Sequence, residues 1–456
     1  MRNFPMHFWR QFIQHKDLIA LRSEHATEQT EINFATWGKT LQRVAIALME
    51  QGLEQGSRVG LVADASFEWF TLAMATWLAG GCVVPIRHDL ERRPTLRALA
   101  RSGCDLIAIS TTKKLDQLRG QGQLPDHLKW FVLHQQDNLP STERITSWKD
   151  LLEQGRFREL RGGDKQLAKR MYDAPTTNPT LILFDPEHTE DPHGAFFSGE
   201  QLAHYLDALG QDLRFDAQET LALAMNPGWF HALLLGVSAL LQGHTLCVEP
   251  SGQHTIDALP THHPTKLLVH TDYLEQKGQA LREILEKQPD ILQKIEEAPT
   301  QEAKKFSLLG ALNTLGKQAA LNSLYEPIRK ELGKNLNQIF KVGPSLSEGV
   351  VELFEKLDIE VLSLHGYPEV GLTHMERPGT TKKGSVGRPV LGVSARIEGS
   401  KQEEDQGQLL IKTSFSMLGY WDGSGPRTIQ DEWLHTTQQA YIKSGFLYLV
   451  QDDSTP

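Results

Sequence analysis

The sequence predicts an α/β protein with doubly wound sheets, because short apolar runs alternate with amphipathic helices along most of the chain. Within residues 34–51, the side chains of Leu41, Val44 and Leu48 follow the three-and-four spacing of a helix with one apolar face. Buried strands are expected at residues 59–63, 82–86, 105–110, 130–134, 180–184, 220–224 and 245–249. Helices that alternate with them are expected at residues 67–78, 198–209 and 230–242.

Two later stretches depart from this alternation. Residues 271–332 are almost entirely helix-forming, with charged residues spaced among leucines. After Tyr367, short alternating segments separated by glycine and proline predict a small β-rich subdomain. The expected organisation is a first α/β subdomain at 1–178, a second at 179–375 that contains the helical insert 271–332, a β-rich subdomain at 376–450 and a short hinge remnant at 451–456.

Composition and charge restrict the class of function. The 456 residues, of which 39% are hydrophobic, suit a globular protein of two or three domains. The 57 acidic residues outnumber the 47 basic ones and give a formal net charge of −10, without a local cluster of lysine or arginine. A nucleic-acid partner is therefore not expected.

The sequence predicts a cytoplasmic protein. Its three cysteines, Cys82, Cys104 and Cys247, are odd in number and lack the spacing of a metal site, which fits a reducing compartment. Charges interrupt residues 1–18 where a signal peptide needs an apolar core. The longest apolar run, residues 229–241, is shorter than the roughly 20 residues that span a bilayer, so no transmembrane segment is expected.

Several segments between Asn33 and Val450 resemble the AMP-forming acyl-CoA synthetases of the adenylate-forming superfamily. The pieces follow that family's order, and they read INFATWGKTLQRVAIAL, GLEQGSRVGLVADASFEWF, WLAGGCVVPI, GSVGRPVLGV and GYW…DEWLHT. The helical insert at 271–332 is most similar to the long-chain fatty-acyl branch. The resemblance implies the fold of the large N-terminal domain of these enzymes, with two doubly wound α/β subdomains and a small β-rich one.

In that family a loop reading Y-T-S-G-T-T-G-x-P-K-G wraps the triphosphate of ATP with glycines, hydroxyls and a lysine. Here the stretch LILFDPEHTEDPHG, residues 181–194, corresponds to that loop and carries four carboxylates within seven positions. A carboxylate about 5 Å from a phosphate costs roughly 3 kcal/mol at an effective dielectric constant near 20, so the loop is expected to repel ATP. The degenerate loop positions are Asp185, Pro186, Glu187, His188, Thr189, Glu190, His193 and Gly194.

The segment that in the family holds magnesium and adenine is also altered. Aligned with residues 366–371, the family's G-Y-G-x-T-E assigns the adenine-stacking tyrosine to Tyr367. Val370 then replaces the threonine, and Gly371 replaces the metal-binding glutamate. Glu369 stands two positions before the expected carboxylate and is expected to point elsewhere. With these neighbours lost, the favoured role for Tyr367 is to fill a former pocket.

Two further motifs near the end of the sequence depart from the family. The ribose-binding motif W-L-H-T-G-D corresponds to residues 433–438 and ends in Gln438 rather than aspartate, which leaves one acceptor oxygen for two hydroxyls. The family's hinge, V-D-R-K, corresponds to residues 450–453, which read VQDD. Since the sequence ends at Pro456, the C-terminal catalytic domain of the family is expected to be absent.

Trp229 and His231 mark a candidate acyl pocket, since the segment WFHALLLG matches a family segment beside the acyl and nucleotide sites. For His231, structural packing is the favoured alternative. His193 replaces the loop lysine, but the reference pKa of histidine, near 6.5, makes it a poor fixed cation at neutral pH. The acidic run 185–191 has irregular spacing, so no metal site is expected there.

These losses together favour a catalytically inactive acyl-CoA synthetase-like protein that acts as a scaffold or regulatory binding protein in fatty-acid or lipid metabolism. The expected partner is a protein, either an active paralogue or a lipid-metabolic enzyme, which binds near Tyr367, Gln438 and residues 450–456. An acyl chain is a further candidate ligand, and no cofactor is expected. One alternative is a divergent AMP-forming long-chain fatty acid–CoA ligase that uses ATP, Mg²⁺ and coenzyme A with a C-terminal domain supplied in trans. A second alternative is an acyl-chain or acyl-carrier binding module.

Overall fold

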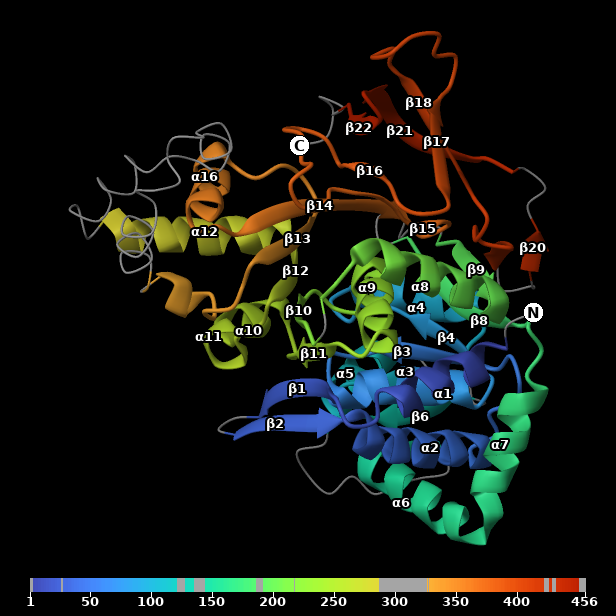
Figure 1. Cartoon of the computed structure of the whole chain (residues 1–456). Coiled ribbons are helices and arrows are strands. Elements are labelled where there is room, and N and C mark those ends of the chain that lie inside the picture. The colour runs from blue at the N-terminus through green and yellow to red at the C-terminus, as the bar shows by residue number, and fades with distance from the viewer. Residues whose placement is uncertain are drawn as a thin grey trace.

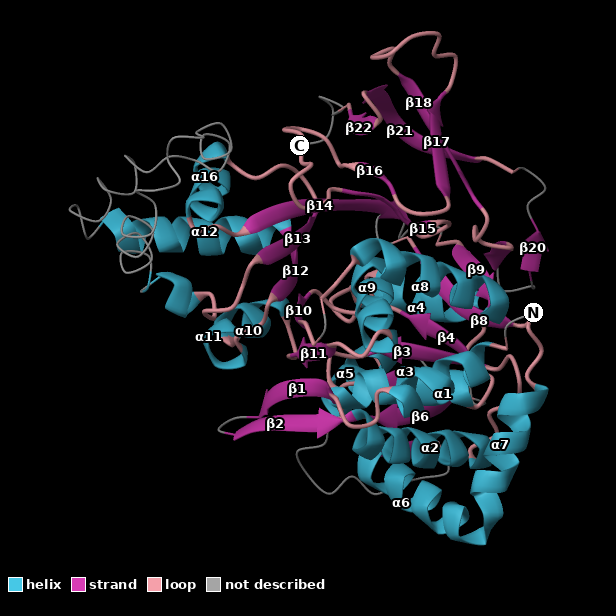
Figure 2. Ribbon diagram, in the orientation of Figure 1, coloured by secondary structure: helices cyan, strands magenta, loops and turns pink. Residues whose placement is uncertain are grey.

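Helices cover both faces of two large sheets, and a smaller third sheet stands at one end of the molecule (Figures 1 and 2). Within the described residues, no helix is both long enough and apolar enough to cross a bilayer. The computed structural model describes residues 3–25, 28–120, 128–134, 144–185, 192–216, 218–286, 326, 328–421, 426–428 and 432–450.

The first large sheet has nine strands in the order β20-β19-β9-β8-β4-β3-β5-β6-β7. Its parallel strands are connected through helices, as parallel pairing requires. Strand β9 runs antiparallel to β8, and β19 runs antiparallel to β9. The strands are β3 (Arg58–Val62), β4 (Cys82–Pro85), β5 (Leu106–Ile109), β6 (Lys129–Val132), β7 (Ile145–Ser147), β8 (Pro179–Phe184), β9 (Gly194–Ser198), β19 (Gly419–Trp421) and β20 (Pro426–Thr428).

The second large sheet also has nine strands, in the order β16-β15-β14-β13-β12-β10-β11-β1-β2. Its centre is parallel, and antiparallel strands close both edges. The strands are β1 (Ile19–His25), β2 (Glu28–Asn33), β10 (Thr220–Ala224), β11 (Thr245–Val248), β12 (Lys266–His270), β13 (Gln338–Val342), β14 (Glu360–Tyr367), β15 (Gly371–Met375) and β16 (Arg388–Pro389).

One continuous apolar core joins the two large sheets through five helices. Helix α9 is buried along its whole length, and α3 is buried from Trp69 to its end. The indole of Trp77 donates a hydrogen bond of 2.8 Å to the carbonyl of Thr180, which ties α3 to the strand that precedes the candidate loop. The five helices are α1 (Phe4–Gln14), α2 (Phe34–Glu50), α3 (Phe67–Leu78), α8 (Gly199–Leu213) and α9 (Phe230–Leu241).

The remaining helices cover the outer faces. Helices α4 (Arg92–Ser102) and α5 (Thr112–Arg119) pack on the first sheet. Helices α10 (Gly252–Asp257), α11 (Leu259–His262), α12 (Thr271–Glu286) and α16 (Glu348–Lys356) pack on the second. Helix α6 (Trp148–Arg158), a π-helical turn η1 (Glu159–Gly163) and α7 (Asp164–Asp173) contact α2 at the lower edge of the molecule in Figure 1.

The third sheet is antiparallel and has four strands in the order β17-β18-β21-β22. Val370, from the turn between β14 and β15, belongs to its small apolar core together with Leu409 and Ile411. The turn is thereby fixed to this sheet. The strands are β17 (Val393–Ile397), β18 (Gly407–Thr413), β21 (Leu434–Lys443) and β22 (Phe446–Leu449).

The predicted α/β fold class is confirmed, and the expected helix at 67–78 coincides with α3. The hairpin β1–β2 was not predicted from the sequence, and it extends the second sheet beside β11. Likewise, β19 and β20 extend the first sheet although they follow the second in the chain. Most of the expected helical insert, residues 287–325 and 327, lies outside the described residues, which show α12 at its start.

Gly155 gives a direct test of how α6 packs. A Cβ atom at this position would stand 2.1 Å from the carbonyl oxygen of Arg43 in α2. Although alanine normally favours a helix, Gly155→Ala is expected to lower the free energy of unfolding by about 2 kcal/mol because α6 must move away from α2. Urea denaturation measures this change, with Gln166→Ala on the exposed side of α7 as the control that changes little. Equal stability of the two variants would contradict the described packing.

Candidate functional site

The loop that corresponds to the family's nucleotide loop joins β8 to β9. Asp185 and His193 lie at its two ends in the structure, and Gly194 begins β9. Gly194 is buried, and a Cβ atom there would stand 2.5 Å from the side chain of Ile182, so close packing of the hairpin accounts for this glycine. The other predicted loop positions, Pro186, Glu187, His188, Thr189 and Glu190, lie outside the described residues.

Tyr420 connects the ends of this loop to the turn between β14 and β15. It is held beside the loop because β19 pairs with β9, with Tyr420 opposite Ala195. Its hydroxyl donates a hydrogen bond of 3.0 Å to Oε1 of Glu369, and its ring meets the ring of His193 edge-on at 5.8 Å between centroids. Burial raises the pKa of Tyr420, and the carboxylates of Glu369 and Asp185 raise it further. The carboxylates of Glu369 and Asp185 therefore both favour the neutral form of the Tyr420 hydroxyl.

The turn between β14 and β15 carries the carboxylate of Glu369, although the aligned position of the family's glutamate is Gly371. Contrary to expectation, Glu369 faces Tyr420 and the loop ends. Gly371, assigned to the position of the family's glutamate, has φ of +68° and lies under Tyr205, where a Cβ atom would stand 2.7 Å from the ring. The Tyr205 hydroxyl also accepts a hydrogen bond of 2.8 Å from the N–H of Leu372. Position 371 has no room for a metal-binding side chain.

Tyr367 and Gln438 are both engaged by neighbouring protein groups. The Tyr367 hydroxyl lies 3.1 Å from Nε2 of His365, and its ring packs against the core of the third sheet. The side-chain amide nitrogen of Gln438 donates hydrogen bonds to the carbonyls of Gln439, at 2.9 Å, and Val450, at 3.0 Å. The Gln438 amide is thus tied to its own sheet rather than extended from it.

Trp229 and His231 lie at the start of α9 in a group of aromatic and imidazole rings. The guanidinium of Arg87 stacks over Trp229 at 4.3 Å, and His231 stacks on Phe230 at 3.8 Å between ring centroids. Burial, together with smaller effects of His365 and His270, lowers the pKa of His231 to about 3. Burial also lowers the pKa of His365 to about 4. At neutral pH His231 and His365 are therefore uncharged, and the charge of Arg87 is paired with Asp89 at 2.6 Å.

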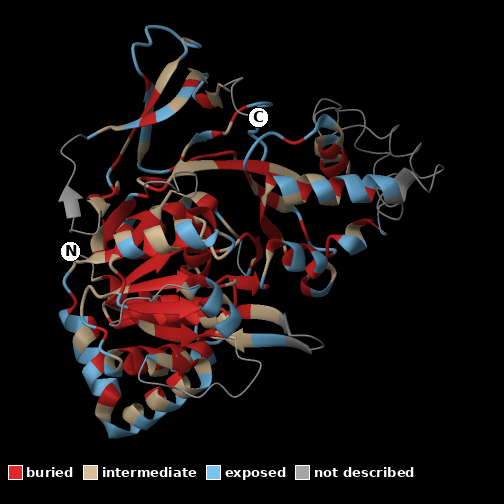
Figure 3. Cartoon of the chain, turned by 180° about the vertical axis from the view of Figure 1, so that it is seen from behind, coloured by how far each residue is buried: buried red, intermediate tan, exposed pale blue. Residues whose placement is uncertain are grey.

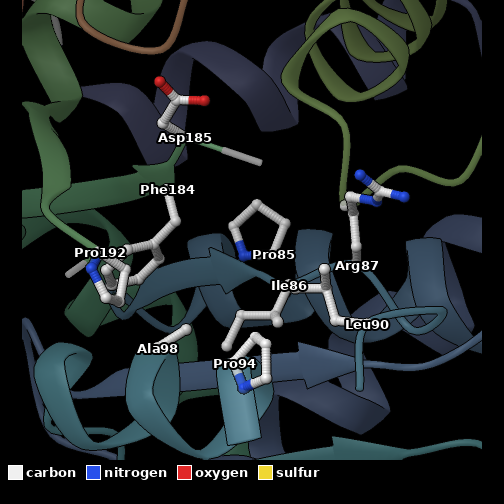
Figure 4. A pocket seen from close by; sticks show the side chains of 10 residues that line it. Pro85, Ile86, Arg87, Leu90, Pro94, Ala98, Phe184, Asp185 and Pro192 are labelled. Carbon is white, nitrogen blue, oxygen red and sulfur yellow. The ribbon is translucent and has the colours of Figure 1, made fainter. Parts of the chain in front are cut away.

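A recess of about 350 Å³, partly open to solvent, lies between the ends of β4 and β8 (Figure 4). Its walls are mainly apolar, and Arg87 and Asp185 stand at its polar edge. Gly228, which precedes Trp229, also lines it. The recess therefore connects the loop with the start of α9. Its lining includes Pro85, Ile86, Leu90, Pro94, Ala98, Phe184 and Pro192.

The structure brings the predicted site residues together in two adjoining groups. Asp185 and His193 meet Glu369 through Tyr420, and His231 approaches Tyr367 through His365. Glu369 and Tyr420 were missed as site residues. A signal for Glu369 exists in the sequence, because a shift of two positions in the motif G-Y-G-x-T-E aligns its second glycine with Gly366 and its glutamate with Glu369. Among the described residues, no group of three or more histidine, cysteine, aspartate or glutamate side chains is arranged to hold a metal ion.

Comparison with known proteins decides the family. The model of the AMP-binding enzyme family matches residues 8–421. This chain belongs to the AMP-binding enzyme family. It is 20% identical over 453 residues to the long-chain-fatty-acid–CoA ligase ACSBG2 of Xenopus laevis, with 95% of this chain and 60% of that protein covered. It is 22% identical to the long-chain-fatty-acid–CoA ligase heimdall of Drosophila melanogaster, with 91% and 63% covered.

The chain therefore spans 60% and 63% of the length of these two relatives. Among solved structures, the N-terminal domain of FACL13 from Mycobacterium tuberculosis superposes with a TM-score of 0.69 at 16% identity, covering 99% of this chain and 100% of that one. The anthranilate CoA ligase AuaEII, in complex with anthranoyl-AMP, gives a TM-score of 0.70 at 14% identity, covering 98% and 77%. These likenesses establish the fold of the family's N-terminal domain for the whole chain.

Gly371→Glu tests whether a carboxylate at this position can restore a metal site. The substitution is expected to lower the free energy of unfolding by more than about 3 kcal/mol, because it combines a left-handed backbone with a clash against Tyr205. Gly384→Ala is the control, since φ there is +81° but nothing lies within 4 Å, so only the backbone cost of about 1 kcal/mol applies. Urea denaturation and titration with Mg²⁺ are the measurements. A stable Gly371→Glu protein that binds Mg²⁺ would contradict the described turn.

The buried imidazole of His231 predicts a pH dependence of stability. Because burial holds its folded-state pKa near 3, below the unfolded value of 6.5, its neutral form stabilises the fold above pH 6.5. That contribution is lost as the pH falls from 6.5 toward 3, by up to about 1.4 kcal/mol per pH unit. Between about pH 6 and pH 4, His231→Phe is therefore expected to lose about 2 kcal/mol less stability than the wild type.

Chemical denaturation at a series of pH values measures the effect. His204→Asn, on the exposed side of α8, is the control and should keep the wild-type slope. An identical pH slope for His231→Phe and the wild type would show that His231 is not held neutral.

Proposed function

We propose that this chain is a catalytically inactive acyl-CoA synthetase-like protein that works as a scaffold or regulatory binding protein in lipid metabolism. Membership of the AMP-binding enzyme family and the fold of its N-terminal domain support the acyl-CoA synthetase-like part of the proposal. The long-chain-fatty-acid–CoA ligases among its relatives support a role near fatty-acid chemistry. The proposal that the chain is catalytically inactive depends on the chemistry of the loop between β8 and β9 and of the residues around it.

The observation that carries the proposal is the pair of carboxylates, Asp185 and Glu369, gathered about Tyr420 at the ends of the loop. A triphosphate needs positive charge or backbone N–H groups at this place, because its own charge is highly negative. The sequence from residue 185 to 194 contains neither lysine nor arginine and only one glycine. The loop sequence itself therefore supplies no cation to offset the electrostatic cost of bringing ATP here.

The acyl side of the site supports a binding role. Trp229, His231 and His365 form a largely aromatic group at the start of α9, in which both imidazoles are neutral, and such a group suits a hydrocarbon chain better than an anion. We propose that an acyl chain, either free or on a carrier, is the ligand most compatible with this group. The expected protein partner, the surface near Tyr367 and Gln438, and a cytoplasmic location remain parts of the same proposal.

A divergent AMP-forming long-chain fatty acid–CoA ligase is the second candidate, and Glu369 favours it. With the motif shifted by two positions, Gly366 and Glu369 match the family's glycine and glutamate, while His365 replaces the tyrosine and Pro368 the threonine. Glu369 also faces the ends of the loop, as a residue that binds magnesium near phosphates should. Under this reading ATP, Mg²⁺ and coenzyme A are substrates or cofactors.

Titration calorimetry with Mg-ATP separates the two candidates. The inactive protein is expected to show no binding at micromolar concentrations and no release of pyrophosphate with a long-chain fatty acid, because the carboxylates in the loop sequence repel phosphates. Glu369→Gln is then expected to remain equally unresponsive. The divergent ligase predicts micromolar binding in the wild type and a loss of at least tenfold in Glu369→Gln.

A control must show that the absence of binding is not the absence of folding. Thermal unfolding of the wild type and of Glu369→Gln should be cooperative, since the hydrogen bond from Tyr420 survives with the amide oxygen as acceptor. Micromolar affinity for Mg-ATP in a folded wild type would overturn the inactive reading.

A further inference from the structure

The corner where α6 turns into α7 carries two large apolar side chains in solvent. Phe157 is 53% exposed and Leu160 is 81% exposed, and among the other large hydrophobic residues of the described chain only Ile13, Tyr172 and Leu391 are exposed to a similar degree. Figure 1 shows this corner at the lower edge of the molecule, and Figure 3 shows exposed residues along both helices. Exposed apolar residues that are adjacent on a protruding feature indicate contact with another surface.

The corner is held rigidly from behind. Leu151 of α6 is fully buried, and Gly155 lets the helix backbone approach the carbonyl of Arg43 in α2. Arg158 pairs with Glu50, and Glu159 accepts a hydrogen bond of 2.8 Å from Arg43. These contacts use the inner side of the corner, and Phe157 and Leu160 remain exposed on its outer side.

Positive charge surrounds the two apolar side chains. Arg156, Arg161 and Lys165 are exposed. Two carboxylates lie between residues 156 and 165: Asp164 is exposed, and Glu159 is partly covered by its ion pair with Arg43. The Arg161 guanidinium lies 3.9 Å from the centre of the Phe157 ring, which brings a cation to the edge of the apolar group. The formal net charge of residues 156–165 is positive, although that of the whole chain is −10.

We propose that this corner docks on the surface of an anionic membrane. Phe157 and Leu160 enter the boundary between lipid headgroups and acyl chains, and Arg156, Arg161 and Lys165 contact the anionic headgroups. A corner with two apolar side chains offers much less area than the roughly 800 Å² per partner of a stable protein interface, whereas a bilayer accepts single inserted side chains. The net negative charge of the chain opposes attachment in other orientations, so attachment takes place through this corner.

Screening of charge by salt also favours attachment through this corner. At physiological ionic strength the Debye length is about 8 Å, so the membrane acts on the charges at the corner and only weakly on acidic residues farther away. Attachment through the corner orients α6 and α7 toward the bilayer, while β16 and the third sheet lie at the opposite end of the molecule in Figure 1.

Sedimentation with vesicles tests the proposal on the full chain. Vesicles of phosphatidylcholine with about 30% phosphatidylserine are compared with vesicles of phosphatidylcholine alone. The wild type is expected to sediment with the anionic vesicles, to bind the neutral ones at least tenfold more weakly, and to dissociate as sodium chloride is raised. The double variant Phe157→Ser with Leu160→Ser and the single variant Arg161→Glu are each expected to lower binding at least tenfold.

Leu391→Ser is the matched control, because Leu391 is 52% exposed and follows β16 at the far end of the molecule. It should bind anionic vesicles as the wild type does, and all variants should keep the wild-type unfolding temperature. Absence of wild-type binding, equal binding to neutral vesicles, or equal loss in Leu391→Ser overturns the proposal. A change in self-association by the corner variants, without vesicle binding in the wild type, assigns the corner to a second copy of the chain and also overturns it.

Discussion

The burial of α3 and α9 is the constraint on which the rest of the structure depends. Helix α9 has no exposed side, and α3 is buried from Trp69 to its end. Neither helix is stable alone in water with such an apolar surface, so both must be enclosed by other elements. The core that encloses them contains strands of both large sheets. The two sheets are therefore fixed relative to each other by the need to cover these helices.

This constraint decides where polar groups can gather. The helices fill the interior, so the loop after β8 and the start of α9 are displaced to the ends of the strands. The hydrogen bond from Trp77 to the carbonyl of Thr180 fixes the strand that leads into the loop. At the other side, Val370 fixes the turn that carries Glu369. A change of chemistry at Asp185 or His193, the described ends of the loop, therefore leaves this core intact, because neither side chain belongs to it.

Local patterns in the sequence predicted part of this core, although helix α1 was not among the expected elements. The apolar stretch 67–78 predicts α3 in full, because a long apolar helix needs no information beyond its own residues. The hairpin β1–β2 was missed because its residues, such as Glu31 and Thr30, are mainly polar and its place is set by pairing with the distant strand β11. The position of Tyr420 beside the loop has the same cause, since it comes from β19 pairing with β9 across more than 200 residues.

The turn after β14 shows that one sequence alone does not fix how a short motif is aligned. Two registers of G-Y-G-x-T-E each match two residues, one through Gly366 and Tyr367 and the other through Gly366 and Glu369. The number of identical residues does not distinguish the two registers, whereas the packing of the turn does. Tyr205 occupies the space beside Gly371, and Glu369 accepts the hydrogen bond of Tyr420. A carboxylate is therefore present in the turn, whereas the loop sequence from residue 185 to 194 has no lysine or arginine, so the turn departs less from the family's pattern than the loop does.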